Sequence, residues 1–189
     1  MTDILIASGT PIVWANATDF NPTAAQAWVA TRTHQIDLTS VAAGAFRQGV
    51  KADLGAATWA QRYMLVASIE PVSAPAAIGY YQFWLGFSDS GTAANNNPGN
   101  LSGSAEAYVG YGAASTDADE VVNGAGSGGL NYVGALGVSA DDDVFVGFVG
   151  IVVPKFPYVC SLFRNSTSVA LEGDAVEMSI SLYPLQDSF

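Results

Sequence analysis

The alternation of apolar and polar positions is strongest in residues 62–88. Two segments, 63–70 and 80–87, carry an apolar side chain at every second position, which is the period of a β-strand, and the positions between are mostly apolar as well. A strand with two apolar faces is buried on both or offers one of them to a partner. Prolines at 71 and 75 interrupt the run, so we predict two strands joined by a loop or a crossing and not by a tight hairpin.

The same alternation assigns the two faces of the second strand. Phe83 and Leu85 stand in one apolar row and are expected in the core. Tyr80 and Trp84 stand in the other row, which needs either the opposing sheet or another subunit to cover it. We therefore expect Tyr80 and Trp84 at an assembly interface.

Period-two patterns recur along the chain and predict about eight strands. Residues 144–153 are apolar on both faces, whereas Arg47, Gln48, Lys51 and Asp53 predict a solvated edge for residues 46–54. The predicted strands are 33–39, 46–54, 62–70, 80–88, 130–138, 144–153, 158–165 and 176–182.

Helical periodicity is absent over any stretch longer than ten residues. Residues 89–100 and 116–129 are rich in Gly, Asn and Asp and predict long loops, and 104–111 fits one or two helical turns or a short strand. We predict an all-β fold, a single antiparallel β-sandwich of jelly-roll type, although immunoglobulin-like sandwiches and closed barrels give the same pattern.

The chain length suits one domain with an extended lead-in. Residues 1–30 hold short apolar pieces flanked by Ser, Gly and Pro, and we predict an N-terminal arm and lead-in there, followed by the β-sandwich in 31–189. Ile4, Leu5 and Ile6 are β-formers too few to form an independent element, so we expect them to pair with a sheet edge, in the same chain or in a neighbour.

Charge and composition limit the classes of partner that the chain is expected to bind. Only 12% of the residues are charged, where about a quarter is usual, so part of the surface is expected to meet protein and not water. The net charge of −11 argues against a nucleic acid bound through its phosphates and against an anionic membrane. The longest apolar run stops at Pro154, well short of the roughly 18 residues of a membrane span, and the N-terminus lacks the basic residues of a secretion signal.

Catalytic, metal and cofactor motifs are weak. His34 is the only histidine and no G-x-S-x-G motif accompanies it, and Cys160 is the only cysteine, expected as a small buried hydrophobe. The G-x-G-x-x-G match at 124–129 lacks the strand before and the helix after that a dinucleotide site requires. We expect no enzyme, no metal and no cofactor, with calcium as the alternative for the acidic clusters at 117–120 and 141–143.

Three stretches, 31–55, 95–111 and 173–187, resemble a family of small virion structural proteins of tailed bacteriophages in sequence, order and spacing. The chain differs from that family at Asn100, where a glycine is typical, at Ala105, where an acid is typical, and in the loop 112–129. The resemblance implies a non-enzymatic particle component, with no reaction or cofactor attached.

The expected function is therefore a capsid cement or decoration protein, found in the virion after assembly in the host cytoplasm. Its partners would be copies of itself and the major capsid or tail proteins. The alternative is a module of a tail or fibre that adapts the fibre to the particle or binds host-surface glycan, since exposed aromatic rings stack on sugars. The loop residues expected to contact a ligand or partner are Asn97, Asn100, Tyr108, Tyr111, Asp117 and Asp119, together with Tyr132 for a glycan.

Overall fold

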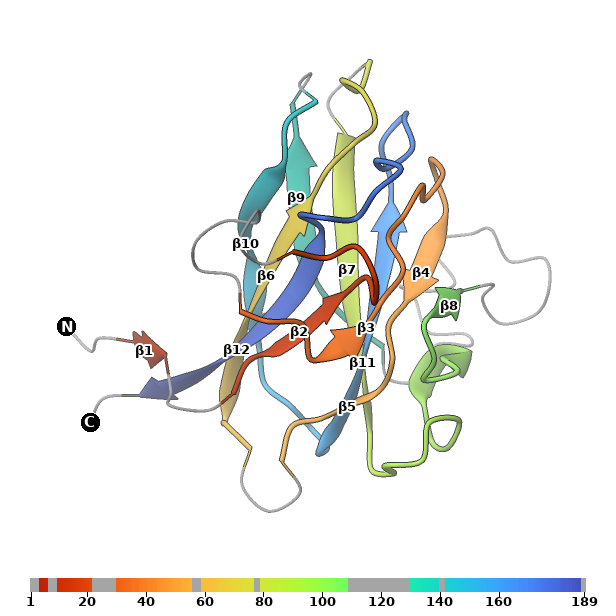
Figure 1. The fold of residues 1–189 in the computed structure, drawn as a ribbon. Coiled ribbons are helices and arrows are strands. Elements are labelled where there is room, and N and C mark those ends of the chain that lie inside the picture. The colour runs from red at the N-terminus through yellow and green to blue at the C-terminus, as the bar shows by residue number, and fades with distance from the viewer. Residues whose placement is uncertain are drawn as a thin grey trace.

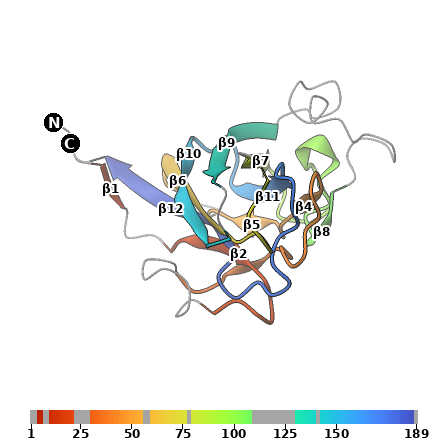
Figure 2. The ribbon, with the colours of Figure 1, turned by 90° about the horizontal axis from the view of Figure 1, so that it is seen from above.

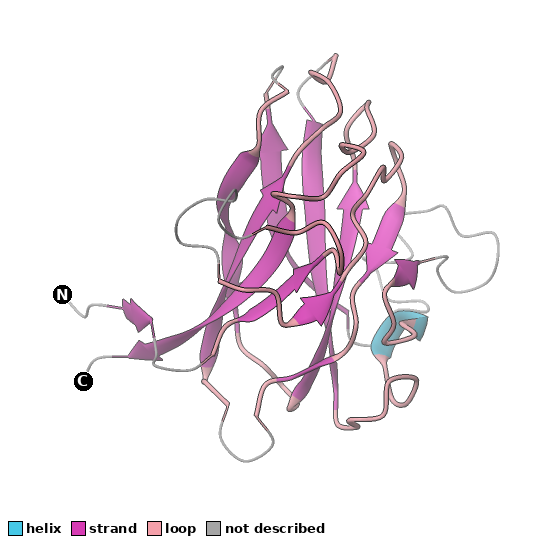
Figure 3. Cartoon of the chain, viewed as in Figure 1, coloured by secondary structure: helices cyan, strands magenta, loops and turns pink. Residues whose placement is uncertain are grey.

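The computed structural model describes residues 4–6, 10–21, 30–55, 59–76, 79–108, 130–139 and 142–187, which form strands, loops and one short 3-10 turn (Figures 1 and 3). The 3-10 turn is η1 (Pro98–Asn100). The strands are β1 (Ile4–Ile6), β2 (Ile12–Ala15), β3 (His34–Gln35), β4 (Phe46–Gln48), β5 (Ala52–Asp53), β6 (Arg62–Ile69), β7 (Gly79–Ser88), β8 (Glu106–Ala107), β9 (Leu130–Val138), β10 (Phe145–Val152), β11 (Tyr158–Asn165) and β12 (Ser179–Asp187).

The strands form two six-stranded sheets packed face to face. Sheet A has the order β10-β6-β12-β2-β3, with β1 also paired to β12, and sheet B has the order β8-β4-β11-β7-β9, with β5 also paired to β11. Neighbours are antiparallel except for β2 and β3. The all-β sandwich is confirmed. Because β6 belongs to sheet A and β7 to sheet B, the two strands do not form a hairpin, as predicted, and of the two expected connections the chain uses the crossing.

The core lies between the sheets and takes alternate residues from the long strands. Leu65 of β6 and Leu182 of β12 contribute from sheet A, and Phe83 of β7 and Phe163 of β11 from sheet B. Phe83 and Phe163 are cross-strand partners with ring centroids 5.6 Å apart. The expected core positions Phe83 and Leu85 are both buried.

The predicted strand bounds agree best with the structure where the period-two run is long. Strands β9 and β11 begin and end at the predicted residues, β6 and β7 differ by one residue at one end, and β10 is one residue shorter at each end. The predicted strand 33–39 contains only β3, and 46–54 is divided into β4 and β5. In place of about eight strands of six to ten residues, the described residues form twelve, of which six have eight to ten residues.

The predicted solvated edge at 46–54 is confirmed only at its end, where β5 pairs with β11 alone and Asp53 is exposed. It was wrong for the rest, because β4 lies between β8 and β11, and both Gln48 and Lys51 are buried. Each finds hydrogen-bond partners in the loop after β7: the Gln48 Oε1 atom accepts from the Ser102 amide at 2.8 Å, and Lys51 donates to backbone carbonyls. A polar residue can be buried when its hydrogen bonds are satisfied, so residue type alone gave the wrong exposure.

The sandwich closes at one side where β9 of sheet B meets β10 of sheet A. A Cβ atom at Gly134 would collide with the carbonyl oxygen of Val149, and one at Gly150 would lie 2.7 Å from the carbonyl oxygen of Val133. Register shifts occur at the same level of both strands. Bulges and glycines are the usual means by which strands bend and backbones approach at such a corner.

The N-terminal segment contributes in two ways. Strand β2, which falls inside the predicted 1–30 lead-in, is a strand of sheet A and is fully buried from Val13 to Ala15. Strand β1 pairs with the last residues of β12, and this two-stranded ribbon extends away from the other strands (Figures 1 and 2). The expected pairing of the arm with an edge of its own chain is therefore present in the fold.

Candidate functional site

The loop that follows β7 covers part of the outer face of sheet B. The Tyr108 hydroxyl donates to the Gly99 carbonyl oxygen at 2.6 Å, and the Asn97 amide donates to the carbonyl oxygens of Ala93 and Leu101 at 2.6 and 2.7 Å. Asn100 is exposed and has a positive φ of 57°. Asn97 and Tyr108 thus hold the loop in place, and Asn100 alone of these three predicted residues faces solvent.

Trp84 is buried by that loop and not by a partner. Its side chain is 1% exposed, its ring lies 6.1 Å from that of Phe46, and Leu101 and Tyr108 belong to the same cluster. The expectation that Trp84 forms an assembly interface was wrong, because a distant segment of the same chain folds back over it. Tyr80, four residues earlier on the same face, is 48% exposed and stays available.

Lys51 fixes the loop from beneath. Its ammonium group donates to the carbonyl oxygens of Ser90, Thr92 and Asn95 at 2.9, 2.7 and 2.8 Å, and to the Ser88 hydroxyl at 3.2 Å. Burial lowers the pKa of Lys51 because the charged form loses water. A buried cation surrounded by acceptors explains how a Gly- and Asn-rich loop keeps one conformation.

Of the remaining predicted site residues, only those of the N-terminal arm lie in the described part of the chain. Ile4, Leu5 and Ile6 form β1 and pair with Asp187, Gln186 and Leu185 of β12. Tyr111, Asp117 and Asp119 lie outside the described residues, as does the glycine-rich match at 124–129.

The side chains considered for catalysis or metal binding, His34 and Cys160 among them, form no such site in the part of the chain that the structure describes. The His34 Nδ1 atom contacts the Thr33 hydroxyl at 2.9 Å, and its pKa is lowered by burial and then by Arg32, with Asp53 opposing. Burial raises the pKa of Cys160 to about 12, so its thiol is inert at neutral pH. Among the described residues, no group of three His, Cys, Asp or Glu side chains could hold a metal ion.

The most exposed apolar surface lies on β10 and the residues that follow it. Phe148, Ile151 and Val153 are 58%, 45% and 65% exposed, and together we call them the β10 stripe. Phe148 pairs with Val66 and Ile151 with Met64, so the stripe lies on the outer face of sheet A. The sequence did mark 144–153 as apolar on both faces, but it gave no sign that the second face stays open.

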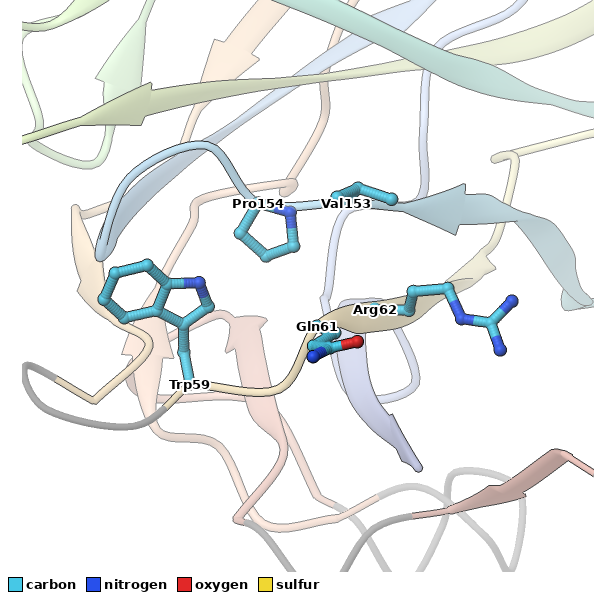
Figure 4. Close-up of a pocket in the computed structure, with 5 residues that line it drawn as sticks. All are labelled: Trp59, Gln61, Arg62, Val153 and Pro154. Carbon is cyan, nitrogen blue, oxygen red and sulfur yellow. The ribbon is translucent and has the colours of Figure 1, made fainter. Parts of the chain in front are cut away.

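An open pocket of about 530 Å³ adjoins the stripe (Figure 4). It is lined by Trp59, Gln61, Arg62, Val153 and Pro154, and the rings of Trp59 and Pro154 face each other across it. Val153 belongs to both the stripe and the pocket. A pocket beside an exposed apolar row is the usual setting of an anchor residue in a protein interface.

The outer face of sheet B is open beyond the reach of the loop. Tyr80 and Tyr132 are each 48% exposed there, and Gln82 and Arg164 lie partly exposed between them. Tyr132 is opposite Trp84, with ring centroids 5.4 Å apart. This surface combines aromatic rings with hydrogen-bonding groups, whereas the β10 stripe is apolar throughout.

The chain is thus an all-β sandwich with two different exposed surfaces, one on each sheet. No family model, curated protein or solved structure matches it. Within the described residues there is no helix whose length and apolar character would let it cross a membrane.

Proposed function

We propose that this protein is a non-enzymatic structural subunit of a tailed-bacteriophage virion, a jelly-roll cement or decoration protein that binds neighbouring shell subunits and copies of itself. The order of the sheets supports the jelly-roll assignment. Eight strands form two four-stranded sets, and the chain changes sheet at every step between them except from β7 to β9, as in the jelly rolls of viral capsid proteins. These sets are β10-β6-β12-β2 and β4-β11-β7-β9.

The observation that carries the proposal is the β10 stripe. Three large apolar side chains in succession remain about half exposed or more on a strand whose other face is in the core. An isolated exposed hydrophobe is ordinary, but a contiguous row beside a pocket is typical of a protein-binding surface. Covering it would remove apolar area from water without burying a charge within the stripe.

The acidic net charge favours a fixed partner over free self-association. At −11, copies of the chain repel one another in solution, although the stripe itself is uncharged. A lattice of shell subunits would overcome this repulsion by supplying a complementary surface at every site. We therefore expect a monomer or small oligomer in solution and high occupancy on the particle.

The stripe can be tested by removing its apolar surface. The double variant Phe148→Ser and Ile151→Thr is expected to keep the melting temperature within about 3 °C, since both side chains are largely exposed, and to lower occupancy on purified particles at least tenfold. Val72→Thr is the matched control, because Val72 is 50% exposed outside the stripe. Unchanged occupancy of the double variant would contradict the proposal.

Copy number separates the cement role from the tail alternative. A copy number comparable with that of the major shell protein, measured by quantitative gel on purified particles, supports the cement role. A copy number as low as that of a tail or fibre component would support the alternative role as a fibre adaptor.

A further inference from the structure

Two exposed tyrosines flank the open half of sheet B. Tyr80 is opposite Gly137 and Tyr132 is opposite Trp84, so the two tyrosines lie four residues apart along β7, about 13 Å at the rise of an antiparallel strand. The contact with the buried Trp84 ring orients Tyr132. The spacing suits an extended ligand that meets one ring at each end.

A polar network fills the space between the rings. Gln82 is opposite Arg164, and its Oε1 atom accepts from the Ser166 hydroxyl at 2.8 Å and from the Arg164 guanidinium at 3.5 Å. The guanidinium has five N–H donors. Gln82 and Arg164 are both partly exposed, and the Gln82 Oε1 acceptor is already occupied by these two bonds. The groups that this face offers are therefore mainly N–H donors of the guanidinium and of the Gln82 amide, and a ligand rich in acceptor oxygens complements them.

The floor of this surface is unobstructed. Ala135 and Gly137, next to Gln82 and Tyr80 on β9, are both exposed, and a Cβ atom built at Gly137 meets nothing within 4 Å. The small side chains leave the surface between the two tyrosines open, so that a flat or extended molecule can lie along it.

We propose that this face, defined by Tyr80, Gln82, Tyr132 and Arg164, binds a neutral oligosaccharide. The tyrosine rings stack on the apolar faces of two sugar rings, and the amide and guanidinium groups hydrogen-bond the hydroxyls between them. An apolar protein segment would remove water from the partly exposed Gln82 amide and Arg164 guanidinium without supplying acceptors for their remaining N–H groups, which is costly. The net charge of −11 disfavours a polyanion at long range.

This binding role is additional to assembly through the β10 stripe. The stripe is on the outer face of sheet A and the tyrosines are on the outer face of sheet B, so a molecule docked by one surface leaves the other accessible. A particle component with this geometry can hold the shell on one side and a surface glycan on the other.

The test begins with the full-length protein on an array of neutral and acidic oligosaccharides, followed by titration calorimetry with the neutral oligosaccharide that gives the strongest signal. Tyr80→Ala and Tyr132→Ala are each expected to weaken binding about tenfold. Phe156→Ala is the matched control, because Phe156 is an equally exposed aromatic residue outside this face. Its affinity should equal that of the unchanged protein.

A second kind of variant tests the same surface without removing a tyrosine ring. Gly137→Leu places a side chain on the open surface between the tyrosines without a clash in the protein, so it should block the ligand and abolish binding. The circular dichroism spectrum and the melting temperature should stay unchanged. No binding of any neutral oligosaccharide, binding only to acidic ones, or full binding by Gly137→Leu would each overturn the proposal. Particle occupancy of Gly137→Leu should be normal, which separates a failure here from a failure of the assembly role.

Discussion

Strands β7 and β10 both carry large apolar side chains on two faces, yet the chain covers the second face of only one of them. On β7, Trp84 is 1% exposed beneath the loop that follows the strand. On β10, Phe148 is 58% exposed. A strand with two apolar faces thus has two different outcomes in one molecule. On β7 a loop of the same chain packs on the outer face, and on β10 the outer face stays exposed.

The difference lies in what holds the cover in place. The loop over Trp84 is fixed by the buried Lys51 ammonium and by the Tyr108 hydrogen bond to Gly99, so it behaves as a third layer on sheet B. On β7, the hydrogen bonds of Lys51 and Tyr108 thus keep the loop over Trp84 and bury its ring.

The largest expected effect comes from truncating the covered ring. Trp84→Ala should lower the free energy of unfolding by about 3–5 kcal/mol, since it leaves a cavity between β7 and the loop. Phe148→Ala, the matched change on β10, should cost less than about 1 kcal/mol. Urea denaturation measures both, and similar losses would show that β10 is as well covered as β7.

A smaller loss is expected from releasing the loop without touching Trp84. Lys51→Met removes a charged donor from three carbonyl oxygens and the Ser88 hydroxyl, each of which keeps one other donor, and should cost about 1.5–3 kcal/mol. Hydrogen exchange should accelerate in residues 95–103 and stay unchanged in β10. Lys155→Met, at an exposed lysine, is the control, and equal protection of the loop in both variants would contradict the role of Lys51.

The smallest effect concerns the acidic cluster at the end of β6, the strand that borders β10. Burial raises the pKa of Glu70 above its ordinary value of 4.5, and Glu177, Glu172, Asp174 and Asp143 raise it further. Because the folded state favours protonated Glu70, this group stabilises the fold fully below pH 4.5 and loses that contribution as pH rises through its folded pKa.

Glu70→Gln mimics the protonated form and should raise the melting temperature at pH 7 by no more than about 2 °C, given its partial exposure. The difference from the unchanged protein should vanish below pH 4. A constant difference across that range would exclude titration of Glu70 as the cause.

Long runs of alternation were sufficient to predict the long strands. Residues 130–138 and 158–165 were bounded correctly because packing of one whole face requires a strict period of two. The bounds of the short strands were not predictable, because two residues carry no period: β3 occupies two residues of the predicted strand 33–39, and β8 falls in 104–111, where a short strand was one of two alternatives. Lys51 was placed at an edge because its hydrogen-bond acceptors lie 37 to 44 residues further along the chain.

The candidate surfaces likewise combine residues that the sequence identified with an arrangement that only the fold produces. Tyr80 and Tyr132 were named from the sequence, but their placement on one face depends on the pairing of β7 with β9, and β11 brings Arg164 beside Gln82. Asn97 and Tyr108 were expected to meet a ligand, and the loop uses them for its own hydrogen bonds.

The amino-acid sequence by itself determined the all-β class, the long strands and which strands have two apolar faces, because these follow from local period and composition. Only the tertiary structure decided that the second face of β7 is closed around Trp84 and that the second face of β10 is open. The reason is physical: covering a face requires contacts between residues far apart in the chain, and no local pattern specifies which distant segment supplies them.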